Sequence, residues 1–323
     1  MTDTPHAAPR PAELETLIGH AVRAPSVLNT QPWQFVVEGS TIHLHADRSR
    51  QLAALDPNGR ELTISCGAAL FYLRTAAQHA GWSPEVAVRP DAEAPDRLAS
   101  ITLRPGSSPR ASDRMFRALS VRSTNRLPFS SEPIPSGALE AMMNAAGTHG
   151  TELHVFDSES QRARLAELVS QGVLKQSQDE AIVADIQAWL RPTSDPRPDG
   201  VRDVDQGAWD RHAMMRTPPS SVAAYKARLV REAPAVLVLS TATEDPNAWL
   251  SAGQALAHAL VVAADHGLAA SYANEPIEVN AVRKAVAALV DGRVPQILFR
   301  VGIPDVEPHT PRRRATDVIS QGT

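Results

Sequence analysis

The sequence predicts an α+β protein made of two related sheet-and-helix units that pack through their long helices. Three observations lead to this prediction. Helical and strand patterns alternate along the whole chain of 323 residues. Two long apolar helical stretches, 60–80 and 247–265, resemble each other in sequence. With 43% apolar residues, the chain can bury a substantial core, either as one large domain or as two of average size.

Composition excludes several classes of protein. The formal net charge is 32 − 36 = −4, so no general basic field favours nucleic acid as a partner. Cys66 is the single cysteine, which rules out an internal disulfide and a cysteine-rich metal site. His43 and His45 share a strand face without a third ligand nearby, so we expect no metal site there. No apolar run approaches ~18 residues and no signal peptide is recognisable, so we expect a cytoplasmic protein without a membrane span.

The first unit, residues 1–108, begins with a polar, proline-containing arm. Apolar residues that recur every three to four positions predict a helix from about Ala12 to Arg23. The turn signal Asp56 to Gly59 precedes a helix that is apolar on most sides, so we expect that helix to be deeply buried. In chain order, the other expected elements are a hairpin of strands at 34–37 and 41–45, the helix at 60–80, and strands at 85–88 and 99–103.

The second unit, residues 109–323, follows a Pro/Gly/Ser-rich linker at 105–109. A helix opens near Ser136, and its periodicity directs Leu139, Met142, Met143 and Ala146 inward. Residues 185–225 are long, rich in Pro, Arg and Asp, and partly apolar, so we interpret them as a lid-like insertion. The other expected elements are helices at 113–120, 160–178, 247–265 and 282–290, and strands at 152–156, 235–240, 270–273 and 296–301.

The two long helices carry an internal repeat. Residues 65–81 and 251–267 align without a gap and share six identities, including Gly67 with Gly253. Glycine inside a helix costs ~1 kcal/mol relative to alanine, so a matched pair predicts close approach of the two helices. Chance similarity of two alanine-rich helices is the alternative. The first helix of each unit has a Leu-Glu pair near its start, at 14–15 and 139–140, and this similarity favours duplication.

The most informative stretch runs from Ala24 to Trp33. Pro25 ends the first helix, because proline lacks a backbone donor and keeps the preceding residue out of the helical region. Hydroxyl and amide groups then gather at a helix-to-strand corner, and they belong to Ser26, Asn29, Thr30 and Gln31. Such a corner suits a flat heterocycle with polar edges. The alternative is a loop whose Asn and Gln satisfy their own backbone.

This stretch resembles the APSxxNxQPW motif of the FMN-dependent nitroreductase superfamily, in which the motif lines one side of the flavin. In that family an Arg-x-Ser/Thr-x-Arg/Lys element precedes the motif within one chain. Here the first unit keeps the motif, and the second unit keeps the other element as Arg122 to Arg126. Each unit lacks what the other retains, so the chain looks like two fused nitroreductase units with one complete and one decayed flavin site. This pattern resembles the Acg-type branch of the superfamily.

The resemblance implies a nitroreductase-like fold that is duplicated within one chain. Ordinary nitroreductases are obligate homodimers, so this chain would be a self-contained pseudo-dimer, and any further homodimer would be additional. The implied cofactor is FMN, the implied electron donor is NAD(P)H, and the implied substrate is a small electron-poor acceptor such as a nitroaromatic or a quinone. The flavin carries the chemistry, so no catalytic residue is expected, and the sequence holds no Ser-His-Asp, HExxH, P-loop or GxGxxG pattern.

An FMN phosphate requires a receptor for a dianion, and guanidinium groups provide charge-assisted bonds to its oxygens. Arg122 and Arg126 flank Thr124, so one turn can direct all three at one anion. The arginines at 312–314 match the family's C-terminal basic element; a solvated tail is the alternative. The residues assigned to cofactor binding are Pro25, Ser26, Asn29, Thr30, Gln31, Arg122, Thr124, Asn125, Arg126, Arg312, Arg313 and Arg314.

The segment from about 189 to 221 separates two functional hypotheses. As a mobile lid it would admit nicotinamide and substrate in turn, and the protein would be an oxidoreductase. As a permanent cover it would make the protein a store for FMN. A surface excursion packed on its own unit is the third interpretation. The side chains suited to a flavin are Trp189, Trp209, Met214 and Met215, and those suited to a dinucleotide phosphate are Arg191, Arg197 and Arg202.

Overall fold

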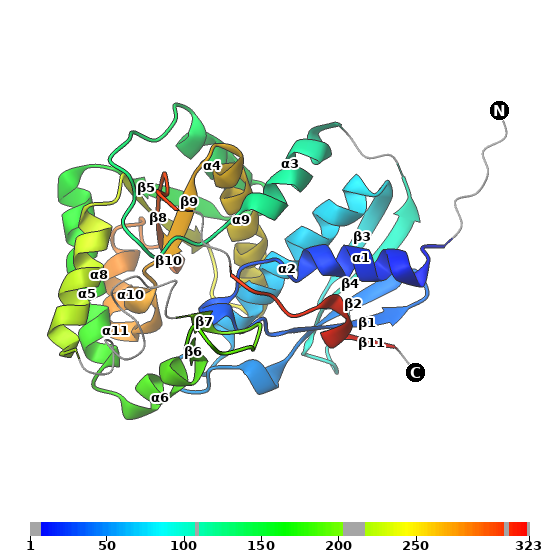
Figure 1. Cartoon of the computed structure of the whole chain (residues 1–323), viewed down its shortest axis with the longest axis horizontal. Helices are drawn as coiled ribbons and strands as arrows, with labels where there is room; N and C mark the ends of the chain where they lie inside the picture. Colours follow the sequence, from blue (N-terminus) through cyan, green and yellow to red (C-terminus); the bar gives the residue numbers. More distant parts are fainter. Residues whose placement is uncertain (1–7, 107–109, 203–216, 307–309, 322–323) are drawn as a thin grey trace.

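The computed structural model describes residues 8–106, 110–202, 217–306 and 310–321, and it places two units next to each other along the long axis (Figure 1). The elements of the first unit are α1 (Pro11–Ala21), β1 (Trp33–Glu38), β2 (Thr41–Ala46), α2 (Arg60–His79), β3 (Trp82–Val88) and β4 (Arg97–Pro105). The elements that follow are α3 (Arg110–Val121), α4 (Ala138–Gly147), β5 (Glu152–Phe156), α5 (Glu159–Gln176), α6 (Glu180–Trp189), β6 (Leu190–Arg191), β7 (Val201–Arg202), α8 (Pro219–Arg231), β8 (Ala235–Thr241), α9 (Pro246–Asp265), β9 (Ala269–Tyr272), α10 (Glu275–Glu278), α11 (Asn280–Ala287), β10 (Val294–Gly302) and β11 (Ile319–Gln321).

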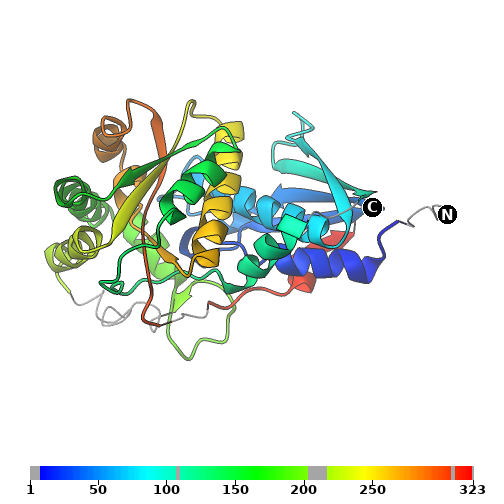
Figure 2. The same ribbon diagram turned by 90° about the horizontal axis from the view of Figure 1, so that it is seen from above.

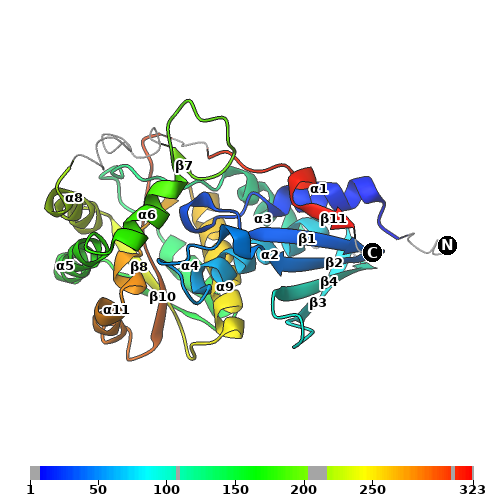
Figure 3. The same ribbon diagram turned by 90° about the horizontal axis from the view of Figure 1, so that it is seen from below.

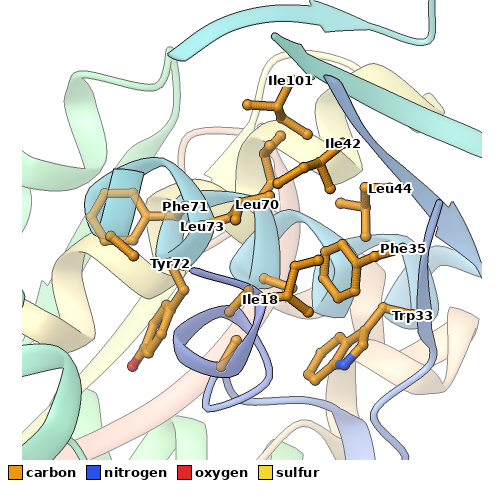
Figure 4. Packing of buried hydrophobic residues seen from close by; sticks show 14 of the residues in the cluster. Ile18, Trp33, Phe35, Ile42, Leu44, Leu70, Phe71, Tyr72, Leu73 and Ile101 are labelled. Carbon is orange, nitrogen blue, oxygen red and sulfur yellow. The ribbon is translucent and has the colours of Figure 1, made fainter. Parts of the chain in front are cut away.

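A five-stranded sheet in the order β11-β1-β2-β4-β3 forms one side of the first unit. The expected hairpin is present, with Phe35 paired to Leu44 in the antiparallel register of β1 and β2. Apolar side chains of this sheet, including Trp33 and Phe35, pack against α1 and α2 (Figure 4). Helix α2 is buried along most of its length, as its apolar sequence predicts.

A four-stranded antiparallel sheet in the order β5-β8-β10-β9 forms the centre of the second unit. Helices α4 and α9 cover one face, and α5, α8 and α11 cover the other (Figure 3). All seven residues of β8 are buried, because both faces of this central strand are covered. The continuous apolar run at 235–240 is the sequence signature of that position.

Helices α2 and α9 pack together at the predicted pair of glycines. A Cβ on Gly67 would lie 2.3 Å from the carbonyl oxygen of Leu250, and a Cβ on Gly253 would lie 2.0 Å from that of Ile64. The contact is reciprocal, since each glycine faces the carbonyl group of the residue three positions before the other glycine. The close approach predicted from the sequence is therefore confirmed.

The two units share an order of elements. In each, a helix precedes two strands, a long central helix, and two further strands, and the strand orders β1-β2-β4-β3 and β5-β8-β10-β9 correspond position by position. In the second unit, α5, α6, β6, β7 and α8 lie between the first two of these strands, and α10 and α11 lie between the last two. The last strand, β11, returns to the first unit and pairs in parallel with β1, so the C-terminal segment crosses from one unit to the other (Figure 2).

Several expectations require correction. Met143 was expected to face inward, but its side chain is 43% exposed, and Ala145 takes the buried position beside Met142 and Ala146. The insertion is more helical than its composition indicates, because α6 lies at its start and α8 begins within it. The predictions for Trp209, Met214 and Met215 concern residues outside the described ranges. No helix in the described parts of the chain has the length and apolarity needed to cross a membrane.

Candidate functional site

A cavity of about 230 Å³ lies between the two units. The first unit contributes Pro25, Ser26 and one face of α2 to its wall, and the second contributes residues of β9, α8 and α10. Arg126 lines the same cavity, so the motif at 24–33 and the element at 122–126 meet in one place although about 100 residues separate them. Charged side chains of both signs line the cavity.

Arg122, Arg126 and Arg312 lie close to one another, and we refer to them as the arginine cluster; of the three, Arg126 lines the cavity. The guanidinium group of Arg122 donates to the hydroxyl of Tyr72 at 2.8 Å. Burial, and then repulsion from the other two arginines, lowers the pKa of Arg312 to about 9, so Arg312 keeps its charge at neutral pH. Burial raises the pKa of Tyr272 to about 12, so its hydroxyl remains protonated beside them.

The arginine cluster draws on both units. Tyr72 belongs to α2, and Figure 4 shows its hydroxyl directed away from the labelled apolar side chains around it. Tyr272 ends β9, whereas Arg312 lies on the segment that crosses back towards β11. Among the described residues, the Nε of Arg312 and the hydroxyl of Tyr272 are buried without a hydrogen-bond partner. A concentration of positive charge with unused donors is suited to an anion with several oxygens, such as a phosphate.

The remaining predicted phosphate ligands have other contacts. Thr124 accepts a hydrogen bond from Arg122 at 3.4 Å and therefore lies beside the arginine cluster. Asn125 closes a turn, since its side chain accepts from the amide of Leu127 at 3.0 Å. Arg313 is directed at Gln31, and Arg314 is 81% exposed and paired with Asp317. Of the three C-terminal arginines, the structure thus brings only Arg312 next to Arg122 and Arg126.

The motif at 24–33 has a strained backbone. Leu28, Asn29 and Gln31 have φ angles of 42°, 54° and 51°, which lie in the left-handed region. Such conformations cost about 1–3 kcal/mol each in non-glycine residues and are concentrated at functional sites. Ser26 supports the turn by accepting from the amide of Gln31 at 2.9 Å. Pro25 and Ser26 line the cavity, whereas the segment 29–31 lies behind that wall.

The polar groups of 29–31 connect neighbouring segments instead of pointing into the cavity. Asn29 donates to the carbonyl of Gly200 at 3.0 Å, and Gln31 donates to that of Pro198 at 2.8 Å. Gln31 also accepts from the amide of Arg313 at 2.8 Å. The hydroxyl of Thr30 is buried without a partner among the described residues. The expected direct contact of Asn29, Thr30 and Gln31 with a ligand therefore does not follow from this arrangement.

Residues 190–202, which we call the strap, close one side of the cavity together with α6. Leu190 and Val201 of the strap and Ile186 of α6 line the cavity. Asp199 pairs with both Arg50 and Arg191, and these two guanidinium groups lie 5.1 and 5.2 Å from the ring centroid of Trp189. Figure 1 shows α6 and the β6–β7 pair next to the first unit. The strap is thus fastened to the first unit across the mouth of the cavity.

The arginines proposed for a dinucleotide phosphate are engaged within this segment. Arg191 is buried and bonded to Asp199, Arg197 pairs with Asp195, and Arg202 donates to the carbonyl of Thr193 at 3.2 Å. Trp189 also packs on guanidinium groups and does not line the cavity. These side chains stabilise the strap in its present position.

Carboxyl groups also line the cavity, those of Glu61, Glu275 and Glu278. Glu61 at the start of α2 accepts from Arg60 at 2.8 Å and from Asn274, and Glu278 accepts from Gln176. Burial raises the pKa of both Glu61 and Glu278, which also form a hydrogen bond with each other. Nearby Glu275 is paired with Lys226 of α8.

Sequence reasoning missed these carboxyl groups and some of the cationic residues in the wall. A charged residue within a continuous apolar strand or helix was the available signal. Arg300 interrupts the apolar run of β10, is 2% exposed, and lines the cavity. Glu61 similarly occupies the first turn of a buried helix. Tyr272 and Glu278 carried no recognisable signal, since their importance depends on which segments meet. Within the described residues, no group of His, Cys, Asp or Glu has an arrangement that would hold a metal ion.

Comparisons with known proteins find relatives of this chain. The model of the nitroreductase family matches residues 119–303. A protein of Mycobacterium tuberculosis (strain ATCC 25618 / H37Rv) named "Putative NAD(P)H nitroreductase Rv3131" is 31% identical, over 95% of this chain and 90% of its own length. The protein named "Putative NAD(P)H nitroreductase acg" from the same strain is 31% identical, over 95% of each chain.

Solved structures resemble part of the chain at low identity. One is the FMN-dependent nitroreductase NfnB from Mycobacterium smegmatis in complex with NADPH, with 15% identity and a TM-score of 0.45. The match covers 64% of this chain and 97% of that chain. Another is the FMN and NADPH-dependent nitroreductase NfnB from sphigopyxis sp. strain HMH, with 20% identity, a TM-score of 0.42, and coverage of 65% and 99%.

Proposed function

The chain belongs to the nitroreductase family, and from that premise we propose that it is an FMN-binding oxidoreductase. It takes reducing equivalents from NAD(P)H and passes them to a small electron-poor acceptor, such as a nitroaromatic or a quinone. The observation that carries this proposal is the arginine cluster, which reaches through Arg126 into a cavity that both units enclose. The named activities of the relatives support it.

The residues of the site fit FMN. The arginine cluster holds the phosphate, and the unpartnered donors on Arg312 and Tyr272 supply the hydrogen bonds that a phosphate accepts. Pro25 and Ser26 border the space for the ring system on the side of the first unit. Bound FMN supplies hydride acceptance and release, which no side chain of the protein can provide.

The protein's own contribution is to position and to shield. The apolar wall from α2 and α8 excludes water, and the strained turn at 28–31 holds Ser26 and the strap in fixed positions. Asn29 and Gln31 therefore act as positioning residues, because they connect the motif to the strap and to the C-terminal segment. This assignment explains why polar residues recur at fixed spacing in the motif although they do not reach the cavity.

The site is single because the two units have diverged. We propose that they arose by duplication, which their common strand order and the reciprocal contact of Gly67 and Gly253 support. At the place in the second unit that corresponds to the motif, the chain reads Gly147-Thr148-His149-Gly150. One chain therefore binds one FMN. The bound flavin lies between the two units, as it would lie between the two subunits of an ordinary homodimer.

A store for FMN with little turnover is the second candidate function. The strap favours it, because Asp199, Asn29 and Gln31 all fasten the strap over the cavity. A cover held by a paired, largely buried Asp199 and by several hydrogen bonds opens less readily than a free loop. The rate of flavin reduction in the intact protein distinguishes the two functions.

The test is an anaerobic stopped-flow experiment on the protein reconstituted with FMN. Mixing with NADPH or NADH should bleach the absorbance of oxidised flavin within seconds, and benzoquinone should restore it. Absorbance that persists for hours with both donors would reject the oxidoreductase and leave the store. A protein that binds no FMN at all would reject both.

A further inference from the structure

We propose that Glu278 is the acid that protonates the electron acceptor, and that Glu61 is the positioning residue that holds this proton in place. The inference rests on the proposed oxidoreductase function and adds a group that the chain itself supplies. We refer to Glu61 and Glu278 as the acid pair. The two come from different units, Glu61 from α2 and Glu278 from α10, and both line the cavity.

The surroundings of the acid pair favour a proton between the two carboxyl groups. They form a hydrogen bond with each other, which two carboxylates cannot do without a proton. Charges of the same sign surround them, since Asp56 lies near Glu61 and Glu275 lies near Glu278. Two carboxyl groups in one buried place retain a proton because both cannot ionise at low cost.

The donors around the acid pair assign that proton to Glu278. Glu61 accepts from Arg60 and Asn274 and lies in the first turn of α2, where the helix favours negative charge. Glu278, by contrast, accepts from the neutral side chain of Gln176. Lys226 of α8 is already paired with Glu275. Glu61 is thus the ionised partner and Glu278 the neutral acid.

Other groups in the wall indicate that a polar ligand completes this part of the cavity. Glu275 is 8% exposed, and its Oε2 has no hydrogen-bond partner among the described residues. Arg300 is 2% exposed, and its Nη1 likewise lacks a partner there. Both residues line the cavity. A buried acceptor and a buried donor that remain unpaired cost free energy unless a ligand pairs with them.

The proposed step balances for a quinone. The acceptor becomes a hydroquinone by gaining one hydride, which brings two electrons, and one proton. FMN, when bound and reduced by NAD(P)H, would supply that hydride. The O–H bond of Glu278 breaks, an O–H bond forms on the acceptor oxygen, and Glu278 remains as a carboxylate that water later reprotonates. An acid whose pKa lies near the working pH is best suited to such a transfer.

The protonation state can be measured without turnover. Infrared spectra of the purified protein at pH 7 should contain the carbonyl band of a protonated carboxyl group, which shifts in D2O. Glu278→Gln should remove this band. The matched control is Glu244→Gln, because Glu244 does not line the cavity. Burial raises the pKa of Glu244, but hydrogen bonds from Arg283 outweigh burial, and the pKa is lowered overall. Glu244 therefore contributes no such band.

Glu61→Gln provides an independent variant. It removes a negative neighbour of Glu278 and keeps the shape of the side chain, so the band should titrate at lower pH than in the wild type. Absence of the band from the wild type, or its persistence in Glu278→Gln, would overturn the proposal. An unchanged titration in Glu61→Gln would show that Glu61 does not hold the proton.

Kinetics then test the role of the proton. In Glu278→Gln, reoxidation by benzoquinone should slow about 100-fold or more, and this loss should exceed any loss in reduction by NADPH. The wild-type rate of reoxidation should fall as the pH rises through the pKa of Glu278, whereas the variant should show no such fall. Equal rates and equal pH profiles would reject the inference. Failure of the wild type to become reduced would instead reject the oxidoreductase function, and the infrared result would remain valid.

Discussion

At the scale of single residues, Arg312 shows how a binding site can oppose stability. Its guanidinium group is held beside Arg122 and Arg126, and burial together with their repulsion lowers its pKa. Burial and repulsion of this charge destabilise the ligand-free protein, and a bound phosphate offsets that destabilisation. We therefore expect Arg312→Met to raise the melting temperature of the FMN-free protein by a few degrees.

The same substitution should weaken FMN binding about 10- to 100-fold, since a charge-assisted hydrogen bond contributes about 1.5–3 kcal/mol. Fluorescence titration with FMN measures the affinity, and calorimetry measures the melting temperature. Arg314→Met is the control, because that side chain is 81% exposed and paired with Asp317. Equal affinities of the two variants would show that the phosphate is held elsewhere.

His149 provides a pH-dependent prediction. Its Nε2 lies 3.3 Å from the Nδ1 of His258. The pKa of His149 is lowered to about 4, mainly by burial and further by the nearby His258 and Arg74. Between that value and the ordinary value of 6.5, the unfolded chain binds a proton that the folded protein does not. Folding stability should therefore fall as the pH drops from 6.5 towards 4.

After allowance for its partial exposure, this residue should account for about 1–2 kcal/mol of that loss. Urea unfolding at pH 7 and pH 4.5 measures it, with His149→Gln as the comparison. The variant should lose less stability on acidification than the wild type. The same loss in both proteins would mean that His149 is not buried in its neutral form.

Single residues differ in how far the sequence reveals them. Arg126 and Ser26 could be predicted because each belongs to a motif of fixed spacing, and both line one cavity. Asn29 and Gln31 belong to the same motif, but their partners lie on segments around 198–200 and 311–313 that no local pattern connects to them. Tyr272 depends entirely on tertiary arrangement.

At the scale of elements, the contact of α2 with α9 depends on two glycines. Replacing Gly67 by alanine places a Cβ 2.3 Å from a backbone carbonyl oxygen, so the helices must separate. We expect Gly67→Ala to lower the free energy of unfolding by about 1–3 kcal/mol. Gly19→Ala in α1 is the control, because its Cβ would meet nothing within 4 Å. It should stabilise by about 0.5–1 kcal/mol, and urea unfolding that gives both variants equal stability would contradict the close contact.

The strap depends on Asp199, whose carboxylate pairs with Arg50 and Arg191 while largely buried. Asp199→Asn should loosen the strap and lower its local opening free energy by about 2 kcal/mol, because it leaves buried guanidinium groups without a counter-ion. Hydrogen exchange of the Gly200 amide, which donates to the carbonyl of Asn29 at 3.2 Å, should become about 30-fold faster. Asp195→Asn, which changes a pair within the strap alone, is the control, and equal exchange in both variants would show that Asp199 does not fasten it.

Regular elements followed from the sequence where one pattern dominated. The hairpin of β1 and β2 and the buried strand β8 agree with their alternation or continuous apolarity. Helix α8 was missed because it begins inside a segment whose composition resembles a loop. Met143 was misplaced because a helix at the surface buries a narrower stripe than its apolar residues indicate.

At the scale of the whole molecule, the site exists only because the chain returns to its first unit. The segment after β10 carries Arg312 to the arginine cluster and then adds β11 to the sheet of β1. Neither unit alone encloses the cavity. Titration of the FMN-free protein should therefore reach saturation at one flavin per chain, and saturation at two would contradict the proposed loss of the second site.

The most direct measurement is a crystal structure of the protein with bound FMN. The account predicts one flavin per chain, with its phosphate among Arg122, Arg126 and Arg312 and its ring between Pro25–Ser26 and the segment at 274–275. A flavin bound at any other place, or a phosphate that contacts none of these three arginines, would contradict it.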